Sequence, residues 1–147
     1  MKISAGIFIT CNNKILLCHP TTLGWTNSFS IPKGGVNDGE SLIDAAIRET
    51  KEEVGITITK DQISNLDNPI EIQYISKKNE LFKKVYVFIS NINDISDIGL
   101  SSEILDTNQL QLSEVDWAGF IDKEESSNKI FFRFKSLLNY LKDTCVI

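Results

Sequence analysis

Residues 34–56, GGVNDGESLIDAAIRETKEEVGI, predict a loop of turn residues that leads into one short helix. The turn residues in and just before this stretch are Pro32, Gly34, Gly35 and Gly39, and such a loop lets the backbone approach a ligand closely. Ser41 stands three residues before Asp44, as in a capping box, and Gly55 stands where a left-handed cap would end the helix. We therefore expect a helix over residues 42–54.

Helical spacing sorts the side chains of this helix into two arcs. The arc that should face a core carries Ile43, Ile47, Thr50 and Val54. The other arc brings together three carboxylates at i, i+3 and i+4, those of Glu49, Glu52 and Glu53. These carboxylates repel one another, and Arg48 and Lys51 are expected only to flank them. A hard divalent cation, Mg²⁺ or Mn²⁺, would stabilise the arrangement, and the alternative is a solvated acidic helix face.

The same stretch resembles the Nudix box, a pattern of Gly, five residues, Glu, seven residues and Arg-Glu-U-x-Glu-Glu-x-Gly-U, where U is a bulky aliphatic residue. Gly34, Glu40 and Arg48 stand at the first three fixed positions, and residues 49–56 complete the motif. Thr50 replaces the first aliphatic residue, although its methyl group can still pack. The resemblance implies the Nudix hydrolase superfamily and an α/β (α+β) fold, an α/β/α sandwich with a mixed sheet between helices.

Carried over position by position, the resemblance also implies the site residues. The divalent-metal ligands would be the Gly34 carbonyl oxygen and the carboxylates of Glu49, Glu52 and Glu53. The catalytic residues would be Glu49, Glu52, Glu53 and Arg48. Either Glu52 or Glu53 would orient or deprotonate the attacking water, and Glu40 would pair with Arg48 to brace the loop against the helix.

A further carboxylate is expected near the end of the chain. Many Nudix sequences carry a glutamate a few residues before a tryptophan, where it acts as an extra metal ligand or base. Here Gln111 lies six residues before Trp117 and Glu114 lies three before it. This departure from the usual spacing leaves Glu114 and Glu103 as candidates for the additional ligand.

Two residues before the box are candidate substrate contacts. Lys33 could reach a phosphate as a compact point charge or remain a solvated turn lysine. Trp25 could stack on a base or cover the edge of the core. The combination of Trp25 with Pro-Lys-Gly-Gly resembles Nudix subfamilies that cleave dinucleoside polyphosphates, diphosphoinositol polyphosphates or RNA caps. His19, the single histidine, is interpreted as structural, with a substrate contact as the alternative because it lies one short loop before the box.

Length and composition predict one domain over residues 1–147. The formal net charge of −5 argues against a nucleic-acid partner other than a capped RNA end. The three cysteines, Cys11, Cys18 and Cys145, show no metal-site spacing, and no signal peptide or membrane span is evident. We therefore expect free thiols and a cytoplasmic location without a membrane partner. A homodimer is common in the superfamily, and nothing in this chain requires one.

Alternating apolar residues and turn signals predict the remaining elements. Strands are expected at residues 3–10, 14–18, 56–58, 70–76, 81–90 and 115–120. Residues 91–113 are expected to be irregular and to form part of a lid. Helical spacing over residues 128–142 predicts a C-terminal amphipathic helix. Its apolar stripe would consist of Ile130, Phe134, Leu137, Leu138 and Leu141.

This site predicts a Mg²⁺-dependent hydrolase that cleaves the P–O–P linkage of a nucleoside diphosphate linked to another moiety X. Bound metal would neutralise the diphosphate, position one phosphorus and lower the pKa of a water. Within this class we favour dinucleoside polyphosphates, with nucleotide sugars such as ADP-ribose and modified nucleoside triphosphates as alternatives. A non-catalytic Nudix-fold module that senses a nucleotide is the alternative of another class, which the loss of a box glutamate would favour.

Overall fold

The computed structural model describes residues 1–23 and 28–141, so Trp25 and Cys145 lie outside the described residues. Its centre is a six-stranded sheet in the order β4-β5-β1-β2-β6, with β3 paired to β1. The strands are β1 Lys2–Cys11, β2 Lys14–Pro20, β3 Lys33–Gly35, β4 Ile70–Ile75, β5 Leu81–Ile92 and β6 Val115–Asp122. β1 runs parallel to β5, whereas the other pairs are antiparallel, so the sheet is mixed.

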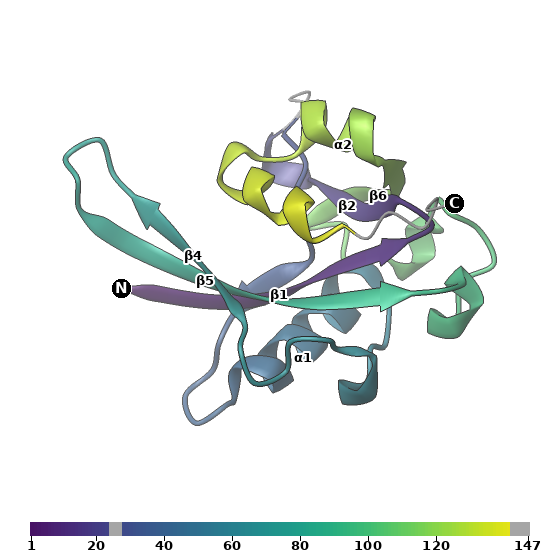
Figure 1. The fold of residues 1–147 in the computed structure, drawn as a ribbon, viewed down its shortest axis with the longest axis horizontal. Coiled ribbons are helices and arrows are strands. Elements are labelled where there is room, and N and C mark those ends of the chain that lie inside the picture. Colours follow the sequence, from purple (N-terminus) through teal and green to yellow (C-terminus); the bar gives the residue numbers. More distant parts are fainter. Residues whose placement is uncertain (24–27, 142–147) are drawn as a thin grey trace.

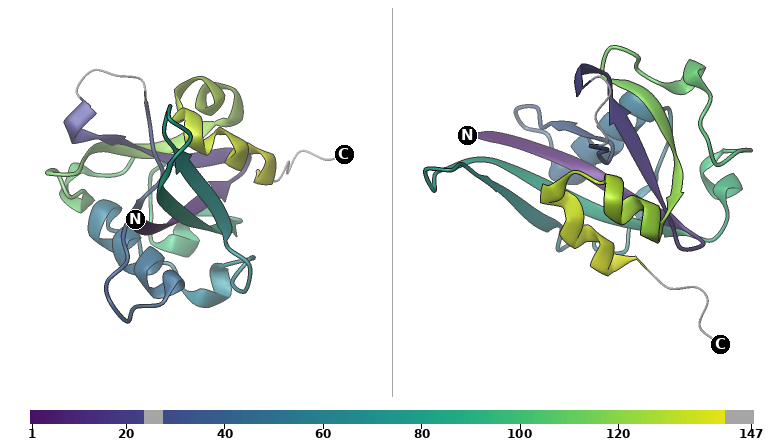
Figure 2. Two further views of the ribbon diagram at one scale, coloured as in Figure 1. Left: turned by 90° about the vertical axis from the view of Figure 1, so that its left-hand side faces the viewer. Right: turned by 90° about the horizontal axis from the view of Figure 1, so that it is seen from above.

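Helical segments cover both faces of this sheet (Figure 1 and Figure 2). α1, Leu42–Val54, lies on one face, and α2, Lys123–Lys129, lies on the other with the 3₁₀ segment η5, Phe132–Tyr140. The remaining 3₁₀ segments are η1 Thr21–Leu23, η2 Lys60–Gln62, η3 Ile95–Ile98 and η4 Thr107–Gln109. The predicted arrangement of a mixed sheet between helices is confirmed.

Strand alternation in β1 supplies both hydrophobic cores. Ala5, Ile7 and Ile9 pack in the core that α1 covers. Phe8, between them, packs in the opposite core with Phe134 of η5. Both faces of the central strand are therefore buried from solvent, and α1 and η5 are held at fixed positions relative to β1.

α1 begins and ends where the sequence predicts. The Ser41 hydroxyl accepts a hydrogen bond from the Asp44 amide, and Gly55 adopts a left-handed φ of 70° while its N–H donates to the Lys51 carbonyl oxygen. The buried stripe is rotated from the predicted arc. Its fully buried residues are Ala45, Ala46, Thr50 and Val54, whereas Ile43 and Ile47 are half-buried. Alanine at the contact lets the helix backbone lie close to the sheet.

The strand predicted for residues 56–58 is wrong. Ile56 and Ile58 are buried and Thr57 is exposed, so the alternation is real, but the segment pairs with no strand in the part of the chain that the structure describes. This part of the chain crosses the core directly after α1 and reaches η2 within a few residues. Burial pattern alone cannot show whether a partner strand lies beside a short extended segment.

The predicted continuous C-terminal helix over residues 128–142 is also wrong. α2 ends at Lys129, and Ile130 is extended because Phe29 pairs with it: the Phe29 amide donates to the Lys129 carbonyl oxygen at 2.8 Å, and the Phe131 amide donates to the Phe29 carbonyl oxygen at 2.7 Å. These bonds interrupt the helix, and the 3₁₀ segment η5 follows. The predicted apolar stripe still packs on the core: Ile130, Phe134, Leu137 and Leu138 are buried and Leu141 is half-buried.

Cys11 and Cys18 are free, buried thiols. Burial raises the pKa of both, and negative charge adds to the effect, mainly from Asp94 at Cys11 and from Glu53 at Cys18. Cys18 Sγ also donates to the Ser30 carbonyl oxygen at 3.2 Å. Within residues 1–23 and 28–141, none of the helices has the length and apolar character needed to cross a membrane.

Candidate active site

Arg48 joins the glycine-containing loop to α1. Its Nε and Nη2 donate to the two carboxylate oxygens of Glu40 at 2.9 and 3.0 Å, and Nη2 also donates to the Gly35 carbonyl oxygen at 2.8 Å. Glu40 in turn accepts a hydrogen bond from the Asn37 amide at 3.1 Å. The bonds between the two side chains lower the pKa of Glu40 and raise that of Arg48. The loop is thus attached to the helix through a two-point ion pair, the pair that the box resemblance implies.

The Arg48 guanidinium also lies among the box carboxylates, whereas the sequence predicted that it would only flank them. Nη1 donates to Glu49 Oε1 at 2.8 Å and to Glu52 Oε2 at 3.1 Å. The long side chain reaches the next turn of the helix. There it offsets part of the repulsion between the carboxylates, a role that the sequence predicted for a bound cation. The acidic arc therefore has a positive group in its midst before any metal binds.

Gly34 lies directly against Glu49. A β-carbon added at Gly34 would collide with the Glu49 carboxylate, so a larger residue would push that side chain away. Pairing of Gly34 with Ala5 in β1 fixes the loop backbone at this point. The metal ligands implied by the resemblance are of two kinds, backbone and carboxylate oxygens. Gly34 and Glu49, which would supply one of each, are thus neighbours in space.

Glu53 is desolvated beside Lys33. Burial, with the charges of Glu49 and Glu114 adding to its effect, raises the pKa of Glu53 to about 8, against the opposing effects of the Lys33 ammonium and the Lys33 backbone amide. The side chains of these four residues therefore interact electrostatically around the start of the box. A bound cation would relieve the same burial and repulsion.

The segment before β6 is anchored to the end of α1, which brings Glu114 to the site. The Gln111 amide donates to the Glu53 carbonyl oxygen at 2.9 Å. Gly55 packs so tightly on Gln109 that an added β-carbon would lie 2.9 Å from the Gln109 backbone oxygen. These contacts explain why the charge of Glu114 acts on Glu53.

Glu103, the other candidate for the additional ligand, is held elsewhere. Both of its carboxylate oxygens accept hydrogen bonds from Lys14 Nζ, at 2.8 and 2.9 Å. Lys14 lies at the turn end of β2. The geometry therefore favours Glu114 over Glu103 as the fourth carboxylate.

The donor set fits a hard divalent cation, because it consists of carboxylate and backbone oxygens without sulfur or imidazole. Across residues 1–23 and 28–141, however, no three carboxylate, imidazole or thiol side chains converge closely enough to hold one ion as they stand. Arg48 Nη1 engages Glu49 and Glu52 in this arrangement. Metal binding would therefore require the arginine to release these two carboxylates while it keeps Glu40.

A cavity of about 240 Å³ opens beside Lys33. Its lining includes Ser30, Lys33, Tyr74, Lys83 and Phe131. Burial lowers the pKa of Lys83, with the positive charges of Lys33 and Lys2 adding to the effect, and burial raises the pKa of Tyr74 to about 12. Lys83 Nζ lies 5.1 Å from the centroid of the Tyr74 ring. Two ammonium groups and two aromatic rings in one cavity suit an anion that carries an aromatic ring.

Sequence reasoning missed Lys83. Lys83 and Lys84 are adjacent in the chain, but Lys84 Nζ lies 3.4 Å from Glu71 Oε1 whereas Lys83 turns to the cavity. The residues that line the cavity include members of β3 and β5 and the residue before η5, which are far apart in sequence. Strand alternation could have separated the two lysines, but it could not have identified the face that lies beside Lys33.

His19 is a buried residue at the end of β2. Its Nδ1 lies 2.7 Å from Asp116 Oδ1, and its ring packs edge-on against Phe29 with centroids 5.1 Å apart. Trp25, which with Lys33 was a candidate substrate contact, lies outside the described residues.

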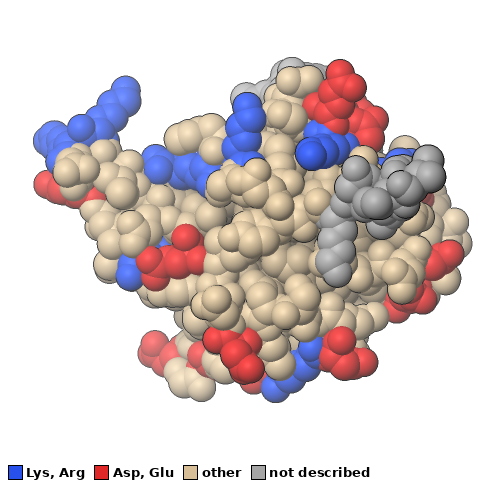
Figure 3. Space-filling model, in the orientation of Figure 1, with Lys and Arg blue, Asp and Glu red and all other residues tan. Residues whose placement is uncertain are grey.

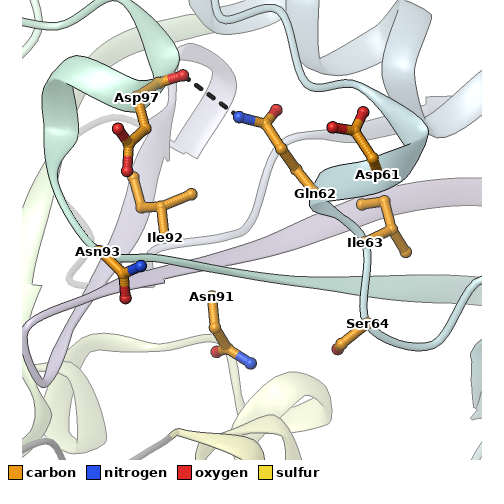
Figure 4. A pocket seen from close by; sticks show the side chains of 8 residues that line it. All are labelled: Asp61, Gln62, Ile63, Ser64, Asn91, Ile92, Asn93 and Asp97. Carbon is orange, nitrogen blue, oxygen red and sulfur yellow. Dashed lines mark hydrogen bonds between the residues drawn. The ribbon is translucent and has the colours of Figure 1, made fainter.

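A larger cavity of about 460 Å³ lies between η2, η3 and the end of β5 (Figure 4). Carboxylates and amides line it, among them Asp61, Gln62, Asn91 and Asp97, and Gln62 Nε2 donates to the Asp97 carbonyl oxygen at 3.2 Å. No lysine or arginine occurs among the described residues that line this cavity. It would repel a diphosphate, so the candidate active site is the box together with the cavity at Lys33.

Comparison with known proteins identifies the family. Residues 1–133 match the model of the family described as NUDIX domain. The chain belongs to the NUDIX domain family. The Nudix resemblance of residues 34–56 is thereby confirmed over most of the chain.

Two curated relatives are similar to this Nudix chain. Nudix hydrolase 2 of Arabidopsis thaliana is 29% identical over 147 residues, which cover 98% of this chain and 47% of the relative. The asymmetrical bis(5'-nucleosyl)-tetraphosphatase of Caenorhabditis elegans is 39% identical over 72 residues, which cover 49% of this chain and 50% of the relative. The chain spans about half the length of the curated relatives it matches.

Solved Nudix structures have the same fold. The binary complex of a C. elegans Ap4A hydrolase superposes with a TM-score of 0.65 at 26% identity, covering 95% of this chain and 93% of that chain. A MutT NUDIX hydrolase from Burkholderia pseudomallei gives a TM-score of 0.71 at 15% identity, covering 96% and 98% of the two chains. The second likeness shows the fold alone.

Proposed function

We propose that this Nudix protein is a Mg²⁺-dependent pyrophosphohydrolase that cleaves a P–O–P linkage in nucleoside diphosphate derivatives, with dinucleoside polyphosphates as its preferred substrates. The observation that carries the proposal is the position of Lys33. Its charge acts on Glu53 of the box, and its side chain lines the cavity that contains Lys83, Tyr74 and Phe131. A polyphosphate would therefore extend from the acidic site into a basic, partly aromatic cavity. Similarity to the C. elegans Ap4A hydrolase supports this substrate class.

The acidic site would hold the metal. Its proposed ligands are the Gly34 carbonyl oxygen and the carboxylates of Glu49, Glu52, Glu53 and Glu114, with Mn²⁺ as a substitute for Mg²⁺. When bound, the metal supplies positive charge that offsets the diphosphate and lowers the pKa of water. Arg48, through its two bonds to Glu40, keeps the loop backbone and Glu49 in register during the reaction.

The remaining residues would position the substrate and accept a proton. Lys33 and Lys83 would bind phosphate oxygens. The rings of Tyr74 and Phe131 would form an apolar wall for one nucleobase of the substrate. Glu52 or Glu53 would orient the attacking water and take its proton. The water oxygen forms a new bond to one phosphorus as the bridging P–O bond breaks, which leaves two phosphorylated products. Positioning and electrostatic stabilisation would supply most of the catalysis.

A substrate panel with Mg²⁺ tests the proposal. The panel contains diadenosine polyphosphates, ADP-ribose, nucleotide sugars, diphosphoinositol polyphosphates and nucleoside triphosphates, with products separated by chromatography. We expect diadenosine tetraphosphate to be cleaved with the highest kcat/KM, and a chelator to abolish the reaction. Preferred cleavage of ADP-ribose or a nucleoside triphosphate would overturn the substrate class. Ligand binding without turnover of any member would favour a nucleotide-sensing module instead.

A further inference from the structure

We propose that the exposed rings of Phe82 and Phe132, which surround the Arg133 guanidinium, form a platform that binds the second nucleobase of a dinucleoside polyphosphate. The inference rests on the function proposed above and extends the substrate site beyond the cavity at Lys33. It gives the enzyme a reason to prefer a substrate with a base at each end of the phosphate chain.

Arg133 is held in place at the centre of this platform. Its guanidinium carbon lies 4.8 Å from the ring centroid of Phe132, 4.8 Å from that of Tyr74 and 5.7 Å from that of Phe82. Its Nη1 and Nη2 donate to the Ile75 carbonyl oxygen at 3.5 and 3.4 Å. These contacts connect η5 to the β4–β5 hairpin and order a planar cation that can stack on a base.

The two phenylalanine rings lie at the surface. Phe132 is 68% exposed and Phe82 is 47% exposed, whereas Phe134, two residues further along η5, is completely buried. Phe134 fills the core, so Phe132 is not required there. Exposed aromatic rings beside an ordered arginine are the side chains on which nucleobases stack.

The platform is continuous with the cavity at Lys33. Tyr74 lines that cavity beneath Lys83 Nζ and contacts Arg133 as well. Phe131 also lines the cavity, and its ring lies 4.9 Å from the ring of Phe132. Figure 1 shows η5, in yellow, beside the β4–β5 hairpin. A phosphate chain bound at the lysines would thus lead its far nucleoside toward the platform.

The charge distribution favours an anionic ligand on this side of the molecule. The chain carries a net charge of −5, yet Figure 3 shows Lys and Arg side chains gathered over the end of the β4–β5 hairpin and between the hairpin and α2. Lys77 and Lys78 lie in the turn of this hairpin, and Lys2 adds positive charge near Lys83. Such a local positive potential attracts a polyphosphate and raises its rate of association.

Calorimetric binding in EDTA tests the platform, with diadenosine tetraphosphate and ATP as the two ligands. The test variant is Phe82→Leu with Phe132→Leu, which keeps apolar bulk but removes the aromatic faces. Its Kd for diadenosine tetraphosphate should rise by about 5- to 100-fold, the range that base stacking on aromatic side chains supports. Its Kd for ATP, which lacks a second base, should stay within about twofold of the wild-type value.

Two controls distinguish stacking from a loss of structure. Phe132→Tyr retains the ring and should retain wild-type affinity. Tyr140→Leu removes a ring that is 49% exposed on the same segment but lines a different cavity with Asn65, and it should change neither Kd. If the double variant does not fold, the single Phe132→Leu variant replaces it, because that side chain is the more exposed.

Three outcomes would overturn the inference: an unchanged Kd for diadenosine tetraphosphate in the variant, an equal loss for both ligands, or no binding of diadenosine tetraphosphate to the wild type. Binding is measured without metal and does not depend on turnover. Wild-type protein that binds through the platform but hydrolyses nothing would therefore contradict the proposed function and leave this inference standing.

Discussion

Arg48 and Glu40 form a two-point ion pair between α1 and the loop that precedes it, with nitrogen–oxygen distances of 2.9 and 3.0 Å. The same guanidinium donates to the Gly35 carbonyl oxygen and to Glu49 and Glu52. One side chain thus sets the distance between the loop backbone and the acidic face of the helix. Only a planar, forked cation can make these bonds together.

Replacing Arg48 by lysine should separate the loop from the helix. The ammonium keeps the charge but cannot bond both Glu40 oxygens and the Gly35 carbonyl together, so the proposed ligands at Gly34 and Glu49 would lose their register. We expect kcat to fall by about 10- to 100-fold and the melting temperature to drop. Lys51→Arg, an exposed exchange on the same helix, is the control; equal activity of the two variants would contradict the bracing role.

The fourth carboxylate can be identified from the dependence of rate on Mg²⁺ concentration. Glu114 acts electrostatically on Glu53, whereas Glu103 is bonded to Lys14. Glu114→Gln should therefore raise the Mg²⁺ concentration needed for half-maximal turnover by about tenfold or more, and Glu103→Gln should leave it unchanged. The reverse result would assign the ligand to Glu103.

Lys83 and Lys84 provide a matched pair of substitutions in β5. Lys83→Gln removes a charge from the cavity and should raise KM for nucleotides by about tenfold, whereas Lys84→Gln only removes a contact with Glu71. Burial lowers the pKa of Lys83, so its ammonium is lost at a lower pH than that of an ordinary lysine. The wild-type KM should accordingly rise toward alkaline pH, and the KM of Lys83→Gln should not follow it. Equal KM values for the two variants would remove Lys83 from the substrate site.

Two buried serines should respond oppositely to replacement by alanine. Both are completely inaccessible, but Ser126 Oγ donates to the Ile121 carbonyl oxygen at 3.1 Å, whereas Ser90 Oγ has no hydrogen-bond partner among the described residues. Ser90→Ala should raise the free energy of unfolding by about 1 kcal/mol, and Ser126→Ala should lower it by about 1 kcal/mol. Urea denaturation measures both, and a loss of stability in Ser90→Ala would show that its hydroxyl has a partner.

The parts of the fold that depend on local sequence could be predicted. Ser41 and Gly55 define the ends of α1 because capping involves residues only a few positions apart. In the tight turn between the antiparallel strands β1 and β2, the positive φ angles fall on Asn12 and Asn13, and asparagine tolerates this conformation. The predictions for residues 56–58 and 128–142 are wrong because the outcome depends on a distant partner: no described residue pairs with Ile56, whereas Phe29 pairs with Ile130.

The candidate site divides in the same way. The spacing of Glu49, Glu52 and Glu53 is visible in the chain because one helix carries all three. The position of Arg48 among them depends on a side-chain conformation, which spacing does not determine. Lys83 and Tyr74 reach the cavity at Lys33 only through sheet pairing and the packing of Phe131, so no local pattern indicates them.

The most direct test of the central claim is the Mg²⁺-dependent turnover of diadenosine tetraphosphate by Glu53→Gln, compared with the wild type and with Glu124→Gln. Glu124 is an exposed glutamate on α2 and serves as the control. If the box glutamates hold the metal that drives P–O–P cleavage, Glu53→Gln should lose at least about 100-fold in kcat and lose its Mg²⁺-induced thermal shift, while its melting temperature without metal stays near that of the wild type. Near-normal turnover in Glu53→Gln would contradict the account and leave the box glutamates without a role in metal binding.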